Sequence, residues 1–112
     1  MSLNGAKALR SLDGNLELLK ELAAIFSEDS SEVLSDFKSA VTAQDAAGAR
    51  LAAHSLKGMT CNFYATDEIE QIAFLEQAAV EENWEVLADA SQTLEQIVQR
   101  LLTEMRSENW IR

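Results

Sequence analysis

The stretch Ala53-His54-Ser55-Leu56-Lys57-Gly58 governs the interpretation of this chain, because it contains the only histidine among 112 residues. We place it in the middle of a helix that runs from about Asp45 to about Tyr64. Successive helical residues are turned by about 100°. On the side opposite His54, this step gathers an apolar stripe of Ala49, Ala52, Leu56, Met59 and Phe63. The stripe predicts the core-facing side of the helix, so His54 faces water or a partner.

Four other residues share the helix face of His54. Lys57 and Gly58 lie three and four positions later, Arg50 lies one turn earlier, and Cys61 lies two turns later. Cations and a bare backbone patch beside an imidazole favour the reception of an anion. Cys61 is equally compatible with a packing role. With one cysteine and one histidine, the chain offers no metal site and no catalytic thiol pair.

The rest of the chain is predicted to be helical, because apolar residues recur at three-four spacing and proline is absent. The expected helices cover residues 3–12, 14–42, 66–82 and 83 to about 105, in addition to the histidine helix. Candidate N-caps are Asp13, Asp45, Thr66 and Asn83. Ser30 interrupts the stripe of the second helix, which we predict to continue through residues 27–32. The predicted fold class is all-α, an antiparallel four-helix bundle with a short N-terminal capping helix.

Length and composition predict a single domain over residues 1–112. Met1 to about Leu3 is also compatible with a remnant of cloning. Residues 107–112 are expected to fray at the C-terminus, with Trp110 exposed.

A net charge of −10, from 19 acids against 9 bases, argues against nucleic acid and anionic membranes as partners. The lone cysteine fits a reducing cytosol, and we see neither a secretion signal nor an apolar run near the length of a membrane span. The predicted localisation is therefore cytoplasmic. The exposed acidic cluster Glu28, Asp29, Glu32 and Asp36 is interpreted as a solvated helix face.

The stretch from His54 to Gly58 resembles the His-x-Leu-Lys-Gly core of the histidine-containing phosphotransfer (HPt) family. Similar family residues fall at 14–18, Phe26, Asp45 and 74–76, so the resemblance covers about Leu12 to Met105. It departs after Gly58. The family usually has small residues there and a second glycine ten places past the histidine, where this chain has Met59, Thr60, Cys61 and Tyr64.

The resemblance implies that His54 is a phosphoacceptor, with Lys57 stabilising phosphoryl oxygens and Gly58 giving clearance to a partner. Arg50 is a weaker candidate helper. The implied partners are receiver domains of a hybrid sensor kinase and of a response regulator, and the implied protein is a monomer. Receivers carry the Mg²⁺, so no cofactor of its own is expected. The chain has no nucleotide-binding pattern, which predicts a phosphotransfer intermediate rather than an ATP-using kinase.

Two other functions are compatible with the sequence. One is a non-catalytic helical adaptor in which the histidine has no chemical role. The departures from the family pattern at Met59 and Tyr64 leave this alternative open. The other is a phosphotransfer domain excised from a larger sensor kinase. The sequence does not name the signalling pathway, the cognate receivers or the direction of net phosphate flow.

Overall fold

Five helices make up the computed structural model, which describes residues 2–112. They are α1 (Gly5–Ser11), α2 (Leu16–Thr42), α3 (Ala46–Cys61), α4 (Thr66–Val80) and α5 (Trp84–Ser107). No strand occurs in the described part of the chain. The predicted all-α fold is confirmed. None of the helices within residues 2–112 has the length and apolar character needed to cross a membrane.

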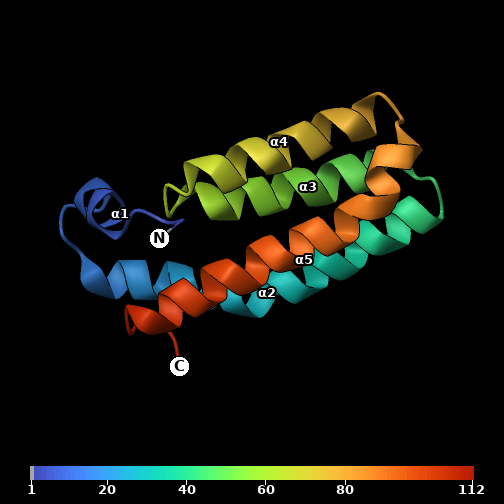
Figure 1. The fold of residues 1–112 in the computed structure, drawn as a ribbon. Helices are drawn as coiled ribbons and strands as arrows, with labels where there is room; N and C mark the ends of the chain where they lie inside the picture. Colours follow the sequence, from blue (N-terminus) through green and yellow to red (C-terminus); the bar gives the residue numbers. More distant parts are fainter. Residues whose placement is uncertain (1) are drawn as a thin grey trace.

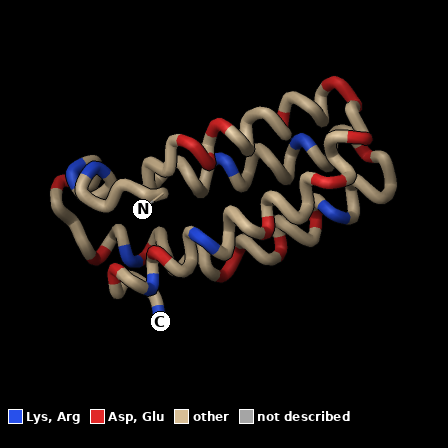
Figure 2. Tube along the Cα trace, in the orientation of Figure 1, with Lys and Arg blue, Asp and Glu red and all other residues tan. Residues whose placement is uncertain are grey.

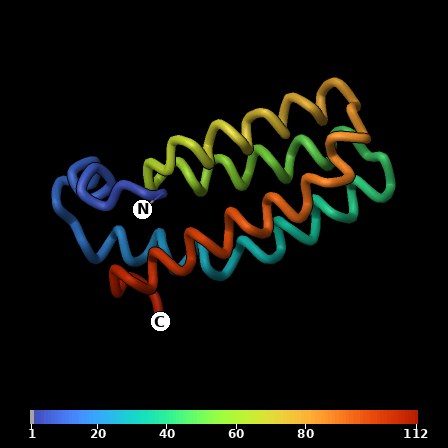
Figure 3. The backbone as a smooth tube through the Cα atoms, viewed as in Figure 1, coloured from blue at the N-terminus to red at the C-terminus, as the bar shows by residue number. Residues whose placement is uncertain are grey.

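The four long helices form an elongated bundle, and the described chain measures 42 × 22 × 20 Å. Consecutive helices run in opposite directions, and α5 returns to pack beside α2 (Figure 1). Helix α1 lies across one end of this bundle, as predicted. The first described residues and the C-terminus lie at that same end (Figure 3). Helices α3 and α4 pack side by side, and this pair carries the site described below.

Short polar residues determine where most of these helices begin. Asn4, Asn15, Asp45 and Asn83 each accept a hydrogen bond from the backbone N–H three residues later. Two predicted caps are wrong by one or two positions. Asp13 lies before the real cap, Asn15, and has a left-handed φ of 54°. Thr66 is the first residue of α4, and Ala65 occupies the N-cap without a side-chain hydrogen bond.

Helix α2 is continuous through residues 27–32, as predicted, and Ser30 is buried within it. The apolar stripe of α3 is also largely confirmed. Ala49, Ala52 and Leu56 are buried, and Met59 packs against the core while partly exposed. The core therefore lies where the sequence pattern placed it.

The C-terminal segment corrects an expectation, because Trp110 is buried rather than exposed. Its ring stacks on Phe63 at a centroid distance of 6.0 Å, and Phe63 in turn meets Phe26 edge-on at 5.9 Å. The backbone N–H of Trp110 donates to the backbone carbonyl of Met105, and this hydrogen bond closes the C-terminal end of α5. Fraying of residues 107–112 was predicted from their position, but an aromatic cluster under α1 holds the segment.

The N-terminal segment also joins this end of the bundle. Leu3 is buried, and its backbone N–H donates to Glu104 Oε1 at 3.0 Å. The Asn4 N–H donates to the carbonyl of Phe63. Met1 to about Leu3 was considered compatible with a remnant of cloning. Met1 lies outside the described residues, whereas Leu3 is part of the packed structure.

Candidate functional site

The start of α3 is fixed by a close contact between its cap and a glycine. Asp45 Oδ1 accepts from the Gly48 N–H at 3.0 Å. A Cβ at Gly48 would lie 2.5 Å from Asp45 Oδ2 and 3.2 Å from the Cβ of Ala40. Because no larger residue fits without a shift, Gly48 lets α3 begin close to α2. This fixed start sets which side chains of α3 face outward.

His54 lies on the outer side of α3. Its neighbours Ala53 and Leu56 are buried, whereas 60% of the His54 side chain is exposed. The imidazole is therefore open to a partner while its helix is anchored in the core. The prediction that His54 faces away from the core stripe is confirmed.

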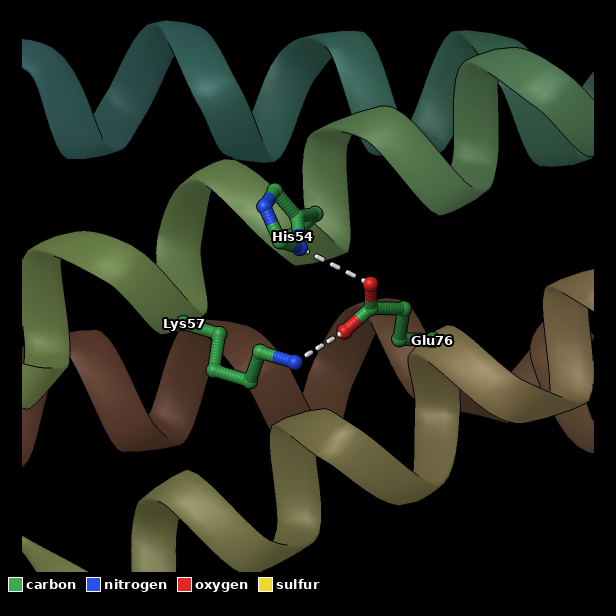
Figure 4. Close-up of polar contacts among 3 residues, drawn as sticks. All are labelled: His54, Lys57 and Glu76. Atoms are coloured by element: carbon green, nitrogen blue, oxygen red, sulfur yellow. Dashed lines mark hydrogen bonds and ion pairs between the residues drawn. The ribbon is translucent and has the colours of Figure 1, made fainter.

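Glu76 of α4 joins His54 and Lys57 into one network (Figure 4). Glu76 Oε1 lies 2.9 Å from His54 Nδ1, and Glu76 Oε2 lies 2.5 Å from Lys57 Nζ. Both carboxylate oxygens are thus engaged, and only 17% of the Glu76 side chain is exposed. The packing of α4 against α3 brings together residues that are 22 positions apart in sequence.

This geometry selects one form of the neutral imidazole. An ionised carboxylate only accepts hydrogen bonds, so the hydrogen atom must be on Nδ1. In neutral histidine the lone pair is then on Nε2. Figure 4 shows the second ring nitrogen on the side of the ring away from Glu76. The lone pair therefore lies on the ring nitrogen that points away from Glu76.

The charges in the network hold Glu76 in its ionised form. The hydrogen bond from Lys57 lowers the pKa of Glu76 below its ordinary value, and the hydrogen bond from His54 lowers it further. Desolvation by burial acts in the opposite direction, but it is outweighed. Glu76 is consequently a carboxylate at neutral pH, and it stabilises a proton on Nδ1.

The other predicted residues lie around the network without joining it. Gly58 is exposed, and a Cβ there would meet nothing within 4 Å. Arg50 and Cys61 are exposed on α3, and Cys61 is a free thiol at its last residue. Lys57, in contrast, belongs to the network, and its side chain is 27% exposed. The sequence predicted a cationic site, whereas the structure places a carboxylate between His54 and Lys57.

Sequence reasoning missed the role of Glu76. The residue was noted only as part of the family-like run 74–76, and no helical spacing connects it to His54. A charged residue on the α3-facing side of α4 was the available signal. Within residues 2–112, no group of three or more His, Cys, Asp or Glu side chains is arranged to hold a metal ion.

The fold and the site together define a helical bundle that presents one carboxylate-bound imidazole to a partner. A comparison with protein families matches residues 21–106 to the Hpt domain. The chain therefore belongs to the Hpt domain family, whose role is phosphotransfer in two-component signalling through interaction with receiver domains. Comparisons with curated proteins and with solved structures gave no match.

Proposed function

We propose that the protein relays a phosphoryl group between aspartates of receiver domains, with phosphohistidine at His54 as the intermediate. One observation carries this proposal, namely the hydrogen bond between His54 Nδ1 and Glu76. It leaves the lone pair on Nε2, and the ring is exposed enough for a second protein to reach it.

In the proposed reaction, Nε2 attacks the phosphorus atom of an aspartyl phosphate on a receiver. A P–N bond forms as the P–O bond to the aspartate breaks, and the aspartate leaves with the electron pair as a carboxylate. The imidazole becomes cationic when phosphorylated, and Glu76 holds the Nδ1 proton and balances this charge. The reverse reaction passes the phosphoryl group to an aspartate of a second receiver.

Lys57 and Gly58 have supporting roles in this proposal. The Lys57 ammonium is positioned one turn from His54 and can contact phosphoryl oxygens as their charge shifts. The open space at Gly58 admits the loops of the receiver. The receiver supplies Mg²⁺ for the transfer, so the chain needs no cofactor of its own.

The charge of the surface around His54 is complementary to the acidic active site of a receiver domain. Helix α3 contains Arg50 and Lys57 and no acid, whereas α2, α4 and α5 all contain acids, in a chain of net charge −10 (Figure 2). A groove of about 500 Å³ between α2 and α3 reaches Ser55, next to His54. Leu51, which lines it, is 59% exposed. A receiver that docks in this groove would meet an apolar contact at Leu51 and the acids Asp36 and Asp45, and the cations of α3 lie beside the groove rather than in it.

The test is label transfer from a panel of phosphorylated receivers of the same organism to the purified protein. We expect acid-labile, alkali-stable label on the wild type and none on His54→Gln. Lys57→Ala should slow the transfer, and Lys38→Ala is its matched control, because Lys38 forms an exposed ion pair with Glu95 away from the site.

The outcomes separate the alternatives. Label that persists in a folded His54→Gln variant would refute the assignment. A wild type that accepts label from no receiver would support the adaptor. Label that arrives only from ATP through a kinase domain would identify the domain of a larger kinase. We expect a monomer in all transfer experiments.

A further inference from the structure

A second groove lies on the other edge of α4, between α4 and α5. It has a volume of about 310 Å³ and is lined mainly by apolar groups, including Phe74, Leu75, Val86 and Ala90. Phe74 is 63% exposed, the largest exposed fraction among the large apolar side chains of the described residues. The phosphotransfer reaction uses none of these side chains.

This groove is separated from His54 by the body of α4. Phe74 and Glu76 are two residues apart, so their side chains point about 160° away from each other around the helix. Glu76 faces α3, where it contacts His54, and Phe74 lines the groove toward α5. A partner in the α4–α5 groove would therefore leave the imidazole free.

Acidic residues surround Phe74. Asp67 and Glu70 lie seven and four positions before Phe74 on the same helical stripe of α4. Glu81, the C-cap residue of α4, lies seven positions after Phe74, and all three acids are exposed. Asp89 lines the groove from α5. Helix α4 contains no lysine or arginine. An apolar anchor within an acidic rim calls for a partner with apolar residues flanked by positive charge.

The same charges argue against a second copy of this chain as the occupant. Two copies meeting through this face would oppose one acidic rim to another, and each chain has a net charge of −10. The groove is long enough to hold one turn of a helix. Val86 and Thr93 are separated by seven residues, or about 10 Å, and two side chains one turn apart on a helix are separated by about 6 Å.

We propose that the α4–α5 groove binds a basic amphipathic helix of a partner protein, which inserts two apolar side chains one turn apart and places lysine or arginine against the acidic rim. The inference is independent of the proposed phosphorelay.

The probe is a set of 14-residue stapled helical peptides with leucine, isoleucine or phenylalanine at positions i and i+4, flanked by lysine. A matched set has glutamate in place of lysine. Binding to the ¹⁵N-labelled full chain is followed by NMR titration. We expect at least one lysine peptide to give saturable shifts at Phe74, Val86 and Thr93. Its affinity should fall about 10-fold or more in Phe74→Ala, and should also fall at high salt.

Ile25→Ala is the matched control, because Ile25 is a 47% exposed apolar residue on α2. It should bind as the wild type does. The proposal is overturned if no lysine peptide gives saturable shifts at the groove, or if glutamate peptides bind equally well. It is also overturned if sedimentation shows a dimer that Phe74→Ala abolishes.

Discussion

Helix α4 carries two glutamates that pair with basic side chains, Glu76 and Glu68. They differ in their burial and in how many of their oxygens are bound. Glu76 binds His54 and Lys57 with both oxygens, and its side chain is 17% exposed. Glu68 is buried, with 4% of its side chain exposed, and only its Oε1 is bound, by Arg100 at 3.1 Å. Its Oε2 has no hydrogen-bond partner within the described residues.

In the proposed reaction, the more buried of the two carboxylates has no role. A phosphoryl group can reach the network of Glu76, because the imidazole beside it is open. No nucleophile adjoins Glu68 in its ion pair, and an unpaired oxygen in the core is unfavourable for the free energy of folding. Burial and charge pairing alone would have selected Glu68, rather than Glu76, as the candidate functional residue.

Glu76→Gln tests this comparison most directly. The amide oxygen can still accept from Nδ1, but it cannot balance the charge of a phosphorylated imidazole. We expect transfer to slow by about 10- to 100-fold, by analogy with the range seen when the partner that orients a metal-binding histidine is changed. The transfer rate is measured by following label from the same phosphorylated receiver to each variant. Glu70→Gln, an exposed acid on the same helix, is the control. Equal rates for Glu76→Gln and the wild type would remove Glu76 from the mechanism.

Gly58→Leu should give the next largest effect on transfer, because the added side chain occupies the open surface one turn from His54. Gly58→Ala should leave the melting temperature unchanged or raise it, since a Cβ there meets nothing. The corresponding gain in the free energy of unfolding is up to about 1 kcal/mol. Gly48→Ala is the matched glycine in the same helix, and it should destabilise by its clash with Asp45. Wild-type transfer by Gly58→Leu would exclude the clearance role.

Glu68→Met tests the other half of the comparison. It removes a desolvated carboxylate with an unpaired oxygen and replaces it with an apolar side chain of similar size. Arg100 is half-exposed and can return to water. Such replacements are often neutral or stabilising by about 1–4 kcal/mol. We expect an equal or higher melting temperature and an unchanged transfer rate. A large loss of stability would show that the Glu68–Arg100 pair holds α4 to α5.

The titration of Glu76 gives a smaller and more local test. Its pKa is lowered when folded, so the stabilisation by this network is fully present above the ordinary carboxyl pKa. It is lost as the pH falls through the lowered value. Carboxyl NMR of Glu76 should show a midpoint below that of free glutamate. In Lys57→Ala the midpoint should rise, because Lys57 is the main cause of the shift. An unmoved midpoint would contradict the close ion pair.

The sequence predicted the helices and the outward direction of His54, because both depend on local periodicity. It missed features that depend on contacts between distant segments. Trp110 looked like part of a fraying end, yet Phe63 and α1 cover it. Glu76 reaches His54 only through the packing of α4 on α3. Asp13 and Thr66 were good caps by residue type, but the path of the turns placed Asn15 and Ala65 at those positions.

The smallest effect is expected at Tyr64, which stands where the family usually has glycine. Tyr64 has a left-handed φ of 54°, just after α3, which explains why glycine suits this position. Its ring is half-buried and lies under Lys7 Nζ at 5.0 Å, an interaction of about 0.5–1 kcal/mol at exposed sites. The strain and the contacts of the ring oppose each other, so the net change in Tyr64→Gly should be small.

Comparing Tyr64→Gly with Tyr64→Ala isolates the strain, because both variants lose the ring and only alanine keeps an unfavourable φ. The glycine variant should be more stable by about 1 kcal/mol in urea unfolding. Asn62, with a right-handed φ of −58°, is the control position, and there alanine should be the more stable of the two. The same order at both positions would mean that the turn after α3 is unstrained. If the order reverses as expected and His54 still accepts phosphoryl groups at the wild-type rate, the turn only connects α3 to α4, and the transfer chemistry belongs to the α3–α4 edge.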